Sequence, residues 1–346
     1  MNKALRNLAT LLILTCTSTS ATAQERPNDI ITADDMGDAD IGGYGCKEKS
    51  QSKGRSETGE FNCFGFSGND LNGLQKWVRF DPQRSYILSS HRGGALPTFP
   101  ENCIATFEHS LAHGCTMLEV DPRLTKDGAI VLHHDKTLDR TTSGTGLLSD
   151  RTLAELQQLT LKDSNGEATP HKMPTLQQVI DWARNKTLLV VDQKDVPLEQ
   201  RIAAITENKA EAFVILIIGN LKHAQQVHAS NPKITMEVMV PNLKRVKAID
   251  ESTLPWRNLI AFIGHQPPYD PDLIKAIHDC GAMCMAGTSR NLDLKLIKAA
   301  TSKATDSTPN QFTESLAESY RNLLDMGIDI IETDLPNQVH DVLRSN

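Results

Sequence analysis

Short apolar runs alternate with amphipathic segments over most of the chain, from about residue 86 onward. Runs such as 187–192 and 213–218 are nearly continuous in Val, Ile and Leu, which is typical of strands buried on both faces of a parallel sheet. Between the runs, apolar residues recur at helical spacing, as in Ile104, Phe107 and Leu111, and Gly114 ends that helix. The pattern predicts strands at 86–90, 116–121, 187–192, 213–218, 234–239, 259–263, 282–286 and 329–333.

The number of these runs favours one class of fold. A closed eight-stranded (β/α)8 TIM-type barrel needs eight parallel strands, each followed by a helix, and about 250 residues. A doubly wound open α/β sheet is the alternative, but no Gly-x-Gly-x-x-Gly turn follows the first predicted strand. We therefore predict an α/β barrel domain over residues 86–346.

One further extended run, 129–134, follows the second predicted strand after only a few residues. Asp127-Gly128 stands between the two runs and is a strong hairpin signal. If these two residues form the turn, His134 lies directly opposite Asp121.

The first residues have the pattern of a secretory signal peptide. Lys3 and Arg6 precede a short apolar stretch, Leu8–Leu14, and the small residues Ala21–Ala23 resemble a cleavage site. The stretch is too short to span a bilayer, although a lipid anchor on Cys16 is an alternative. We predict that residues 1–23 direct export and that the mature protein is periplasmic or secreted.

Residues 24–85 are polar, Gly-rich and aperiodic, which predicts an N-terminal extension packed over the barrel domain. Export would place the remaining cysteines in an oxidising compartment. Cys46 and Cys63 flank a stretch with little apolar content, so we predict a disulfide between them. Cys115 and Cys284 lie in apolar runs and are predicted to be buried thiols. The cysteine spacing does not match a zinc site.

Charge and composition exclude several classes of protein. The chain of 346 residues has 36 Lys and Arg against 43 Asp and Glu, a formal charge of −7. This balance argues against nucleic acid as a partner bound through a global basic field. No apolar run reaches the roughly 18 residues needed to cross a membrane, so no transmembrane segment is expected in the mature chain. The oligomeric state stays open.

Charged side chains gather where the first, second and third predicted strands end and where the hairpin returns. Barrel enzymes carry their catalytic groups at the carboxyl ends of the strands, so these side chains are expected on one rim. Residues two apart on a strand share a face, which places both acids of Glu119-Val120-Asp121 together. The full set is His91, Arg92, Glu119, Asp121, His134, Asp192 and Lys194.

These residue types suit phosphoester chemistry. Three carboxylates favour Mg²⁺ or Ca²⁺ over a softer metal. An arginine fork beside a cation suits a phosphate oxyanion, and two histidines can serve as general base and general acid. For any single acid the alternative is a solvated loop residue, whereas the combination favours an enzyme.

Several short motifs follow one another in order along residues 86–344. They include His91-Arg92-Gly93-Gly94, Pro100-Glu101-Asn102, Glu119-x-Asp121, His134-Asp135, Leu138-Asp139-Arg140-Thr141-Thr142, Asp192-x-Lys194 and Thr333-Asp334-x-Pro336. The chain thereby resembles the glycerophosphodiester phosphodiesterase family. The resemblance implies a barrel enzyme that uses a divalent metal to hydrolyse glycerophosphodiesters, its small-molecule substrates, to sn-glycerol 3-phosphate and an alcohol.

The resemblance also implies a role for each matched residue. These roles are general base for His91, general acid for His134, phosphate binding for Arg92 and Lys194, metal ligation for Glu119, Asp121 and Asp192, and support of the metal and the histidines for Glu101.

The chain departs from the family pattern at three places. The family usually has glutamate where Asp192 stands, and many members have a Trp-Thr pair where this chain has Met283-Cys284-Met285-Ala286. Glu332 is an additional acid beside Thr333-Asp334. These departures predict an altered wall around the substrate. The segment between the hairpin and the third predicted strand has only about 50 residues, too few for a large capping domain, which predicts a pocket that is open except where the N-terminal extension covers it.

Two alternatives to hydrolysis remain. One is a phospholipase-type lyase that stops at a cyclic phosphate, and the other is a non-catalytic barrel that binds anionic ligands.

His133 is predicted to be a packing residue, because it points away from His134 on a strand. His109 and His113 have metal-ligand spacing on a helix, but their expected place outside the barrel favours a solvated surface pair.

Overall fold

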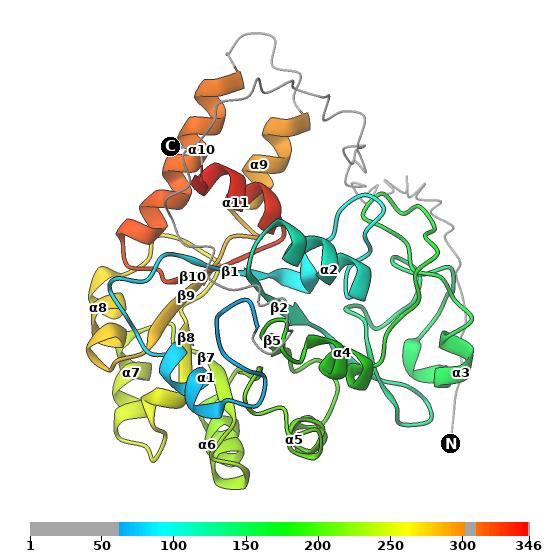
Figure 1. Cartoon of the computed structure of the whole chain (residues 1–346), viewed down its shortest axis with the longest axis horizontal. Helices are drawn as coiled ribbons and strands as arrows, with labels where there is room; N and C mark the ends of the chain where they lie inside the picture. The colour runs from blue at the N-terminus through cyan, green and yellow to red at the C-terminus, as the bar shows by residue number, and fades with distance from the viewer. Residues whose placement is uncertain (1–61, 302–308, 345–346) are drawn as a thin grey trace, which may run out of the picture.

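The computed structural model describes residues 62–301 and 309–344 and shows a closed barrel of parallel strands (Figure 1). Around the barrel the strands follow the order β1-β10-β9-β8-β7-β6-β5-β2, each bonded to its neighbour in parallel register. The prediction of a closed eight-stranded barrel is confirmed. Its strands are β1 (Ile87–Ser90), β2 (Thr116–Val120), β5 (Leu189–Val191), β6 (Val214–Ile218), β7 (Thr235–Met239), β8 (Leu259–Phe262), β9 (Met283–Gly287) and β10 (Ile330–Thr333).

Helices surround the strands, and α9, α10 and α11 gather on one side of the barrel (Figure 1). Helix α4 begins where the sequence predicts: the Thr175 hydroxyl accepts from Gln178 N, and the Gln178 side chain accepts from Thr175 N. The longer helices are α2 (Ile104–His113), α4 (Leu176–Ala183), α5 (Leu198–Glu207), α6 (Leu221–Ser230), α7 (Leu243–Asp250), α8 (Pro271–Asp279), α9 (Leu292–Thr301), α10 (Pro309–Asp325) and α11 (Pro336–Arg344). Shorter ones are α1 (Leu71–Trp77), α3 (Leu153–Leu156), η1 (His91–Gly93), η2 (Leu148–Asp150) and η3 (Trp256–Asn258).

The hairpin after β2 forms, but in a different register from the predicted one. Strand β3 (Pro122–Leu124) pairs antiparallel with β4 (Ile130–Leu132). Thr125 N donates to Ala129 O at 2.9 Å, so the loop has three residues, and Gly128 supplies its left-handed position with φ of 82°. As a result, His133 rather than His134 pairs with Asp121, through a 2.8 Å bond from His133 N to Asp121 O. The prediction of a two-residue turn was wrong.

The described part of the N-terminal extension, residues 62–85, lies at the amino-terminal end of the barrel. Cys63 N donates to Lys186 O just before β5, and Phe80 N donates to Gly281 O just before β9. Phe66, Leu74 and Val78 are buried in the main core. This segment therefore closes the end of the barrel opposite the carboxyl ends of the strands. Within the described residues, the expectation that the extension covers the pocket was wrong.

The disulfide joins Cys63 to Cys115, at an S–S distance of 2.04 Å. The predicted Cys46–Cys63 pair was wrong, and so was the prediction of a buried thiol at Cys115; Cys46 lies outside the described residues. The physical reason is that the extension passes beside the start of β2, where Cys115 stands. A bridge closing a loop of this length contributes about 2–4 kcal/mol to stability. Cys284 is a buried thiol, as predicted.

Within the described ranges, no helix has both the length and the apolar composition that crossing a bilayer requires. Residues 1–23, predicted to direct export, lie outside those ranges.

Candidate active site

Three carboxylates meet at the carboxyl ends of β2 and β5. Oxygen atoms of Glu119, Asp121 and Asp192 all lie within 4.8 Å of one another, and the first two residues are buried. Burial, together with the neighbouring charge of Asp121, raises the pKa of Glu119 well above its usual range. A cation between these oxygens would relieve both effects. The donor set thus fits a hard divalent ion such as Mg²⁺ or Ca²⁺.

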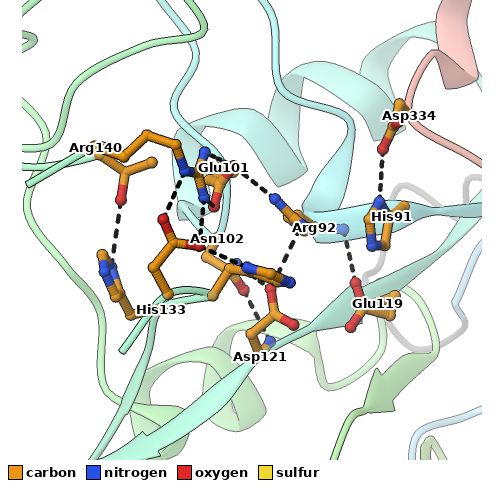
Figure 2. A network of polar contacts seen from close by, with 12 residues as sticks. His91, Arg92, Glu101, Asn102, Glu119, Asp121, His133, Arg140 and Asp334 are labelled. Carbon is orange, nitrogen blue, oxygen red and sulfur yellow. Dashed lines mark hydrogen bonds and ion pairs between the residues drawn. The ribbon is translucent and has the colours of Figure 1, made fainter. Parts of the chain in front are cut away.

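Two further side chains neutralise and orient these acids. Lys194 Nζ lies 2.9 Å from Asp121 Oδ1 and 2.6 Å from Asp192 Oδ2. Partial burial disfavours the charge of this ammonium, but the two carboxylates outweigh it and raise the pKa of Lys194. Asn102 Nδ2 donates to Asp121 Oδ2 at 2.6 Å, and Asn102 Oδ1 accepts from Asp121 N at 2.9 Å. The amide therefore holds Asp121 in a single orientation (Figure 2).

A tight turn after β1 brings Arg92 to the acids. Gly93 follows with φ of 86°, and a Cβ there would lie 2.4 Å from the Phe107 ring, so the turn requires glycine. Arg92 N donates to Glu119 Oε2 at 2.8 Å, and its Nε lies 3.8 Å from Asp121 Oδ2. The guanidinium thus lies against the carboxylate cluster (Figure 2), where a phosphate oxygen bound to a cation would be within its reach.

His91 is oriented by a carboxylate from the last strand. Its Nδ1 lies 2.6 Å from Asp334 Oδ1, just after β10 (Figure 2). Asp334 N in turn donates to Asp293 Oδ2 at 2.8 Å. Burial opposes the charged form of His91. The hydrogen bond with Asp334 and the charges of Glu119 and Glu332 outweigh burial and raise the pKa of His91 to about 10. Since Nδ1 is engaged, Nε2 is the nitrogen left for proton transfer.

His134 is oriented in the same way. Its Nδ1 lies 2.7 Å from Asp135 Oδ1, and partial burial lowers the pKa of His134. Arg140 Nε donates to Asp135 Oδ2 at 2.7 Å, and its two terminal nitrogens donate to Glu101 at 2.8 and 2.9 Å. Glu101 also accepts from Arg92 Nη1 at 3.2 Å. Arg140 therefore links the partner of His134 to the partner of Arg92; Figure 2 shows its bonds to Glu101.

The remaining histidines considered in the sequence have other partners. His133 is buried, and its Nε2 bonds to Thr137 O at 2.9 Å, in keeping with the predicted packing role. The His109 ring stacks on Phe99 with centroids 4.1 Å apart. His113 Nε2 bonds to Asp341 Oδ1 at 3.0 Å. These contacts hold His109 and His113 separately, in agreement with a surface pair rather than a metal site.

The structure brings the eight candidate residues to the carboxyl-terminal side of the barrel, within one network of polar side chains. Sequence reasoning assigned no role to four of their partners. Each of these partners lies in a motif that was recognised but not interpreted: Asn102, Asp135, Arg140 and Asp334.

Comparisons with known proteins place this arrangement in a family. The model of the glycerophosphoryl diester phosphodiesterase family matches residues 91–337. A glycerophosphodiester phosphodiesterase of Caldanaerobacter subterraneus is 39% identical over 161 residues, which cover 44% of this chain and 66% of that protein. A glycerophosphodiester phosphodiesterase of Bacillus altitudinis is 25% identical over 260 residues, which cover 72% of this chain and 95% of that protein.

Solved structures agree with these sequence relatives. A glycerophosphoryl diester phosphodiesterase from Parabacteroides distasonis is 36% identical, with a TM-score of 0.72 over 80% of this chain and 92% of that one. The alignments are shorter for some relatives: they span 66% of the Caldanaerobacter protein and 46% of a Bacillus subtilis relative. The family model, however, matches well over half of the chain, and its region contains the acid cluster and both oriented histidines. The chain belongs to the glycerophosphoryl diester phosphodiesterase family.

Proposed function

We propose that this chain hydrolyses glycerophosphodiesters to sn-glycerol 3-phosphate and an alcohol, and that it depends on a divalent metal. The observation that carries the proposal is the cluster of Glu119, Asp121 and Asp192, flanked by two histidines that are each oriented by a carboxylate. Relatives named as glycerophosphodiester phosphodiesterases support it. Further support comes from an Oleispira antarctica phosphodiesterase of the same fold, which was solved in complex with sn-glycerol-3-phosphate.

In this proposal the chain's own residues bind the phosphate and move the protons. Arg92 and Lys194 hold the phosphoryl oxygens, and the bound metal would supply positive charge to the same oxygens. A cation held by Glu119 would offset the charge that raises the pKa of His91, so His91 Nε2 in its neutral form would accept the proton of the attacking hydroxyl while Asp334 holds the other nitrogen. His134 gives its proton to the departing alcohol oxygen as the bond from phosphorus to that oxygen breaks.

Two nucleophiles are available, the substrate's own glycerol hydroxyl and water. The glycerol hydroxyl is already positioned near phosphorus, so attack by that hydroxyl avoids the entropy of bringing in water and gives a cyclic phosphate. Water then opens the ring in a second step to give sn-glycerol 3-phosphate. A lyase would stop before that step.

Phosphorus NMR of the reaction products tests the proposal. The purified chain is incubated with glycerophosphocholine, glycerophosphoethanolamine or glycerophosphoinositol, with Mg²⁺ or Ca²⁺. We expect free glycerol 3-phosphate. An accumulating cyclic phosphate would identify the lyase, whereas no turnover with either metal would favour the binding barrel.

Replacing Arg140 by alanine is expected to lower kcat/KM by about 10–100-fold, because Asp135 and Glu101 lose their common partner. Arg140→Lys should recover only part of the loss, since an ammonium cannot hold two carboxylates in a fork. Steady-state rates and melting temperatures check this, with the exposed Arg151→Ala as the control. Wild-type rates in Arg140→Ala would show that the network does not position either group.

We also propose that the protein is exported. The Cys63–Cys115 disulfide supports this, because such bonds persist in oxidising compartments. Finding the processed chain in the cytoplasm, with both thiols reduced, would contradict it.

A further inference from the structure

Three polar side chains lie inside the barrel on the face that carries the active-site acids. Ser89 on β1 pairs with Glu332 on β10 and with Met117 on β2, so these side chains share a face with Glu119, two residues after Met117. On β7, Glu237 pairs with Ile217, and the chain of pairs back through β6 and β5 leads to Val190 and Glu119. All three side chains therefore lie on one face of the closed sheet.

Electrostatics identify this face as the interior. Glu237 interacts with Glu332, although β8 and β9 stand between their strands in the barrel. It also interacts with Asp192, two strands away in the other direction. Such electrostatic interactions act across the inside of the barrel. Glu332 in turn interacts with His91, so this set of side chains adjoins the reacting groups.

Two of these side chains have an atom without the hydrogen bond that buried polar groups normally make. Ser89 is 0% exposed, Glu237 2% and Glu332 5%. In the described part of the chain, Ser89 Oγ and Glu237 Oε2 have no hydrogen-bond partner. The Glu332 ion-pair partner, His265 Nδ1, lies 3.9 Å from Oε1, which is beyond hydrogen-bond distance. Buried groups of this kind are matched by a ligand or by ordered water.

The ligand that fits is a neutral polyol rather than an ion. Burial and mutual repulsion raise the pKa of Glu237, and burial raises the pKa of Glu332 to about 7. A protonated carboxyl donates one hydrogen bond and accepts others, as a hydroxyl does. Within the described residues, the carboxylates close enough to share a metal are Glu119, Asp121 and Asp192, and neither Glu237 nor Glu332 belongs to that group.

We propose that Ser89, Glu237 and Glu332 form a hydroxyl-binding subsite that holds the glycerol end of the substrate beneath the phosphate. The inference rests on the proposed function, since that function supplies a ligand with hydroxyl groups beside the phosphorus. It also gives a use to Glu332, the additional acid by which this chain departs from the family pattern.

Calorimetric titration of the full chain, loaded with Ca²⁺, tests the subsite with two probes: sn-glycerol 3-phosphate and inorganic phosphate. Glu237→Ala is expected to weaken glycerol 3-phosphate binding about tenfold, in line with one lost hydrogen bond to a buried group. The affinity of Glu237→Ala for inorganic phosphate should stay within about twofold of the wild-type value. Glu237→Gln, which keeps an acceptor and gains a donor, should retain most of the glycerol 3-phosphate affinity.

Two controls keep the test decisive. Glu318→Ala removes an exposed acid on α10 and should change neither affinity. If Glu237→Ala does not fold, Ser89→Ala replaces it and should weaken binding of glycerol 3-phosphate but not of phosphate. An equal loss for both probes, or no loss for either, would overturn the subsite and leave only ordered water there.

The outcome is separable from that of the proposed function. A wild-type chain that releases glycerol 3-phosphate from glycerophosphocholine, with an unchanged probe preference in Glu237→Ala and Ser89→Ala, would refute the subsite alone. A wild-type chain that binds both probes but never turns over a glycerophosphodiester would refute the function.

Discussion

Turnover of glycerophosphocholine is expected to fall by about 10²–10⁴-fold when either His91 or His134 is replaced by alanine, because each supplies one proton transfer. The carboxylates of Asp334 and Asp135 orient the two imidazole rings for these transfers. Initial rates at saturating metal measure the loss, and circular dichroism checks that the fold survives.

A more reactive substrate separates the two roles. With p-nitrophenol as the leaving group, departure no longer needs a proton, so His134→Ala should recover much of its rate while His91→Ala stays slow. The matched control is His113→Ala, which removes a histidine on the outer helix α2, paired with Asp341. Equal recovery in both variants, or near-normal rates with glycerophosphocholine, would remove the assignment of base and acid.

Activity should disappear in a chelator and return on titration with Mg²⁺ or Ca²⁺, and Asp121→Asn should weaken that recovery by orders of magnitude. Asp121 is 0% exposed and lies within 4.8 Å of the other two acids, so removing its charge disrupts the donor set at its centre. The metal that restores the rate at the lower concentration identifies the preferred ion.

Thermal unfolding gives a readout independent of catalysis. A ligand that binds only the folded state stabilises it by about 2.7 kcal/mol at a hundred times its dissociation constant. The melting temperature of the wild type should therefore rise with metal, whereas that of Asp121→Asn should not. Asp272→Asn, an exposed acid on α8, serves as the control. Full activity in the chelator would contradict the metal site.

Local patterns in the sequence were sufficient for the barrel and for most of the site. The Val-, Ile- and Leu-rich runs predicted the strands because a strand that is buried on both faces has apolar residues at nearly every position. Residues at strand ends then had to meet at one rim, since parallel strands in a closed barrel finish together. That geometry alone grouped Glu119 and Asp121 with Asp192 and Lys194.

Predictions that required the position of a distant segment were wrong or missing. The Asp127-Gly128 signal was real, but a two-residue loop and a three-residue loop both place the glycine at a left-handed position, so the dipeptide by itself does not decide the loop length. The partner of Cys63 depends on where the extension passes the barrel, and the nearest cysteine in sequence was not the nearest in space. The extension also buries Phe66 and Leu74, although its overall composition is polar.

The sequence by itself determined the strand and helix pattern, the closed barrel and the chemical types on its rim, because these follow from short-range periodicity and from the direction of parallel strands. Only the tertiary structure decided the disulfide, the partners of both histidines and the inward direction of Glu237. Those features depend on which segments are neighbours around the barrel and which lie across it. Asp334 and His91, for example, are separated by most of the domain in the sequence, yet their side chains lie 2.6 Å apart.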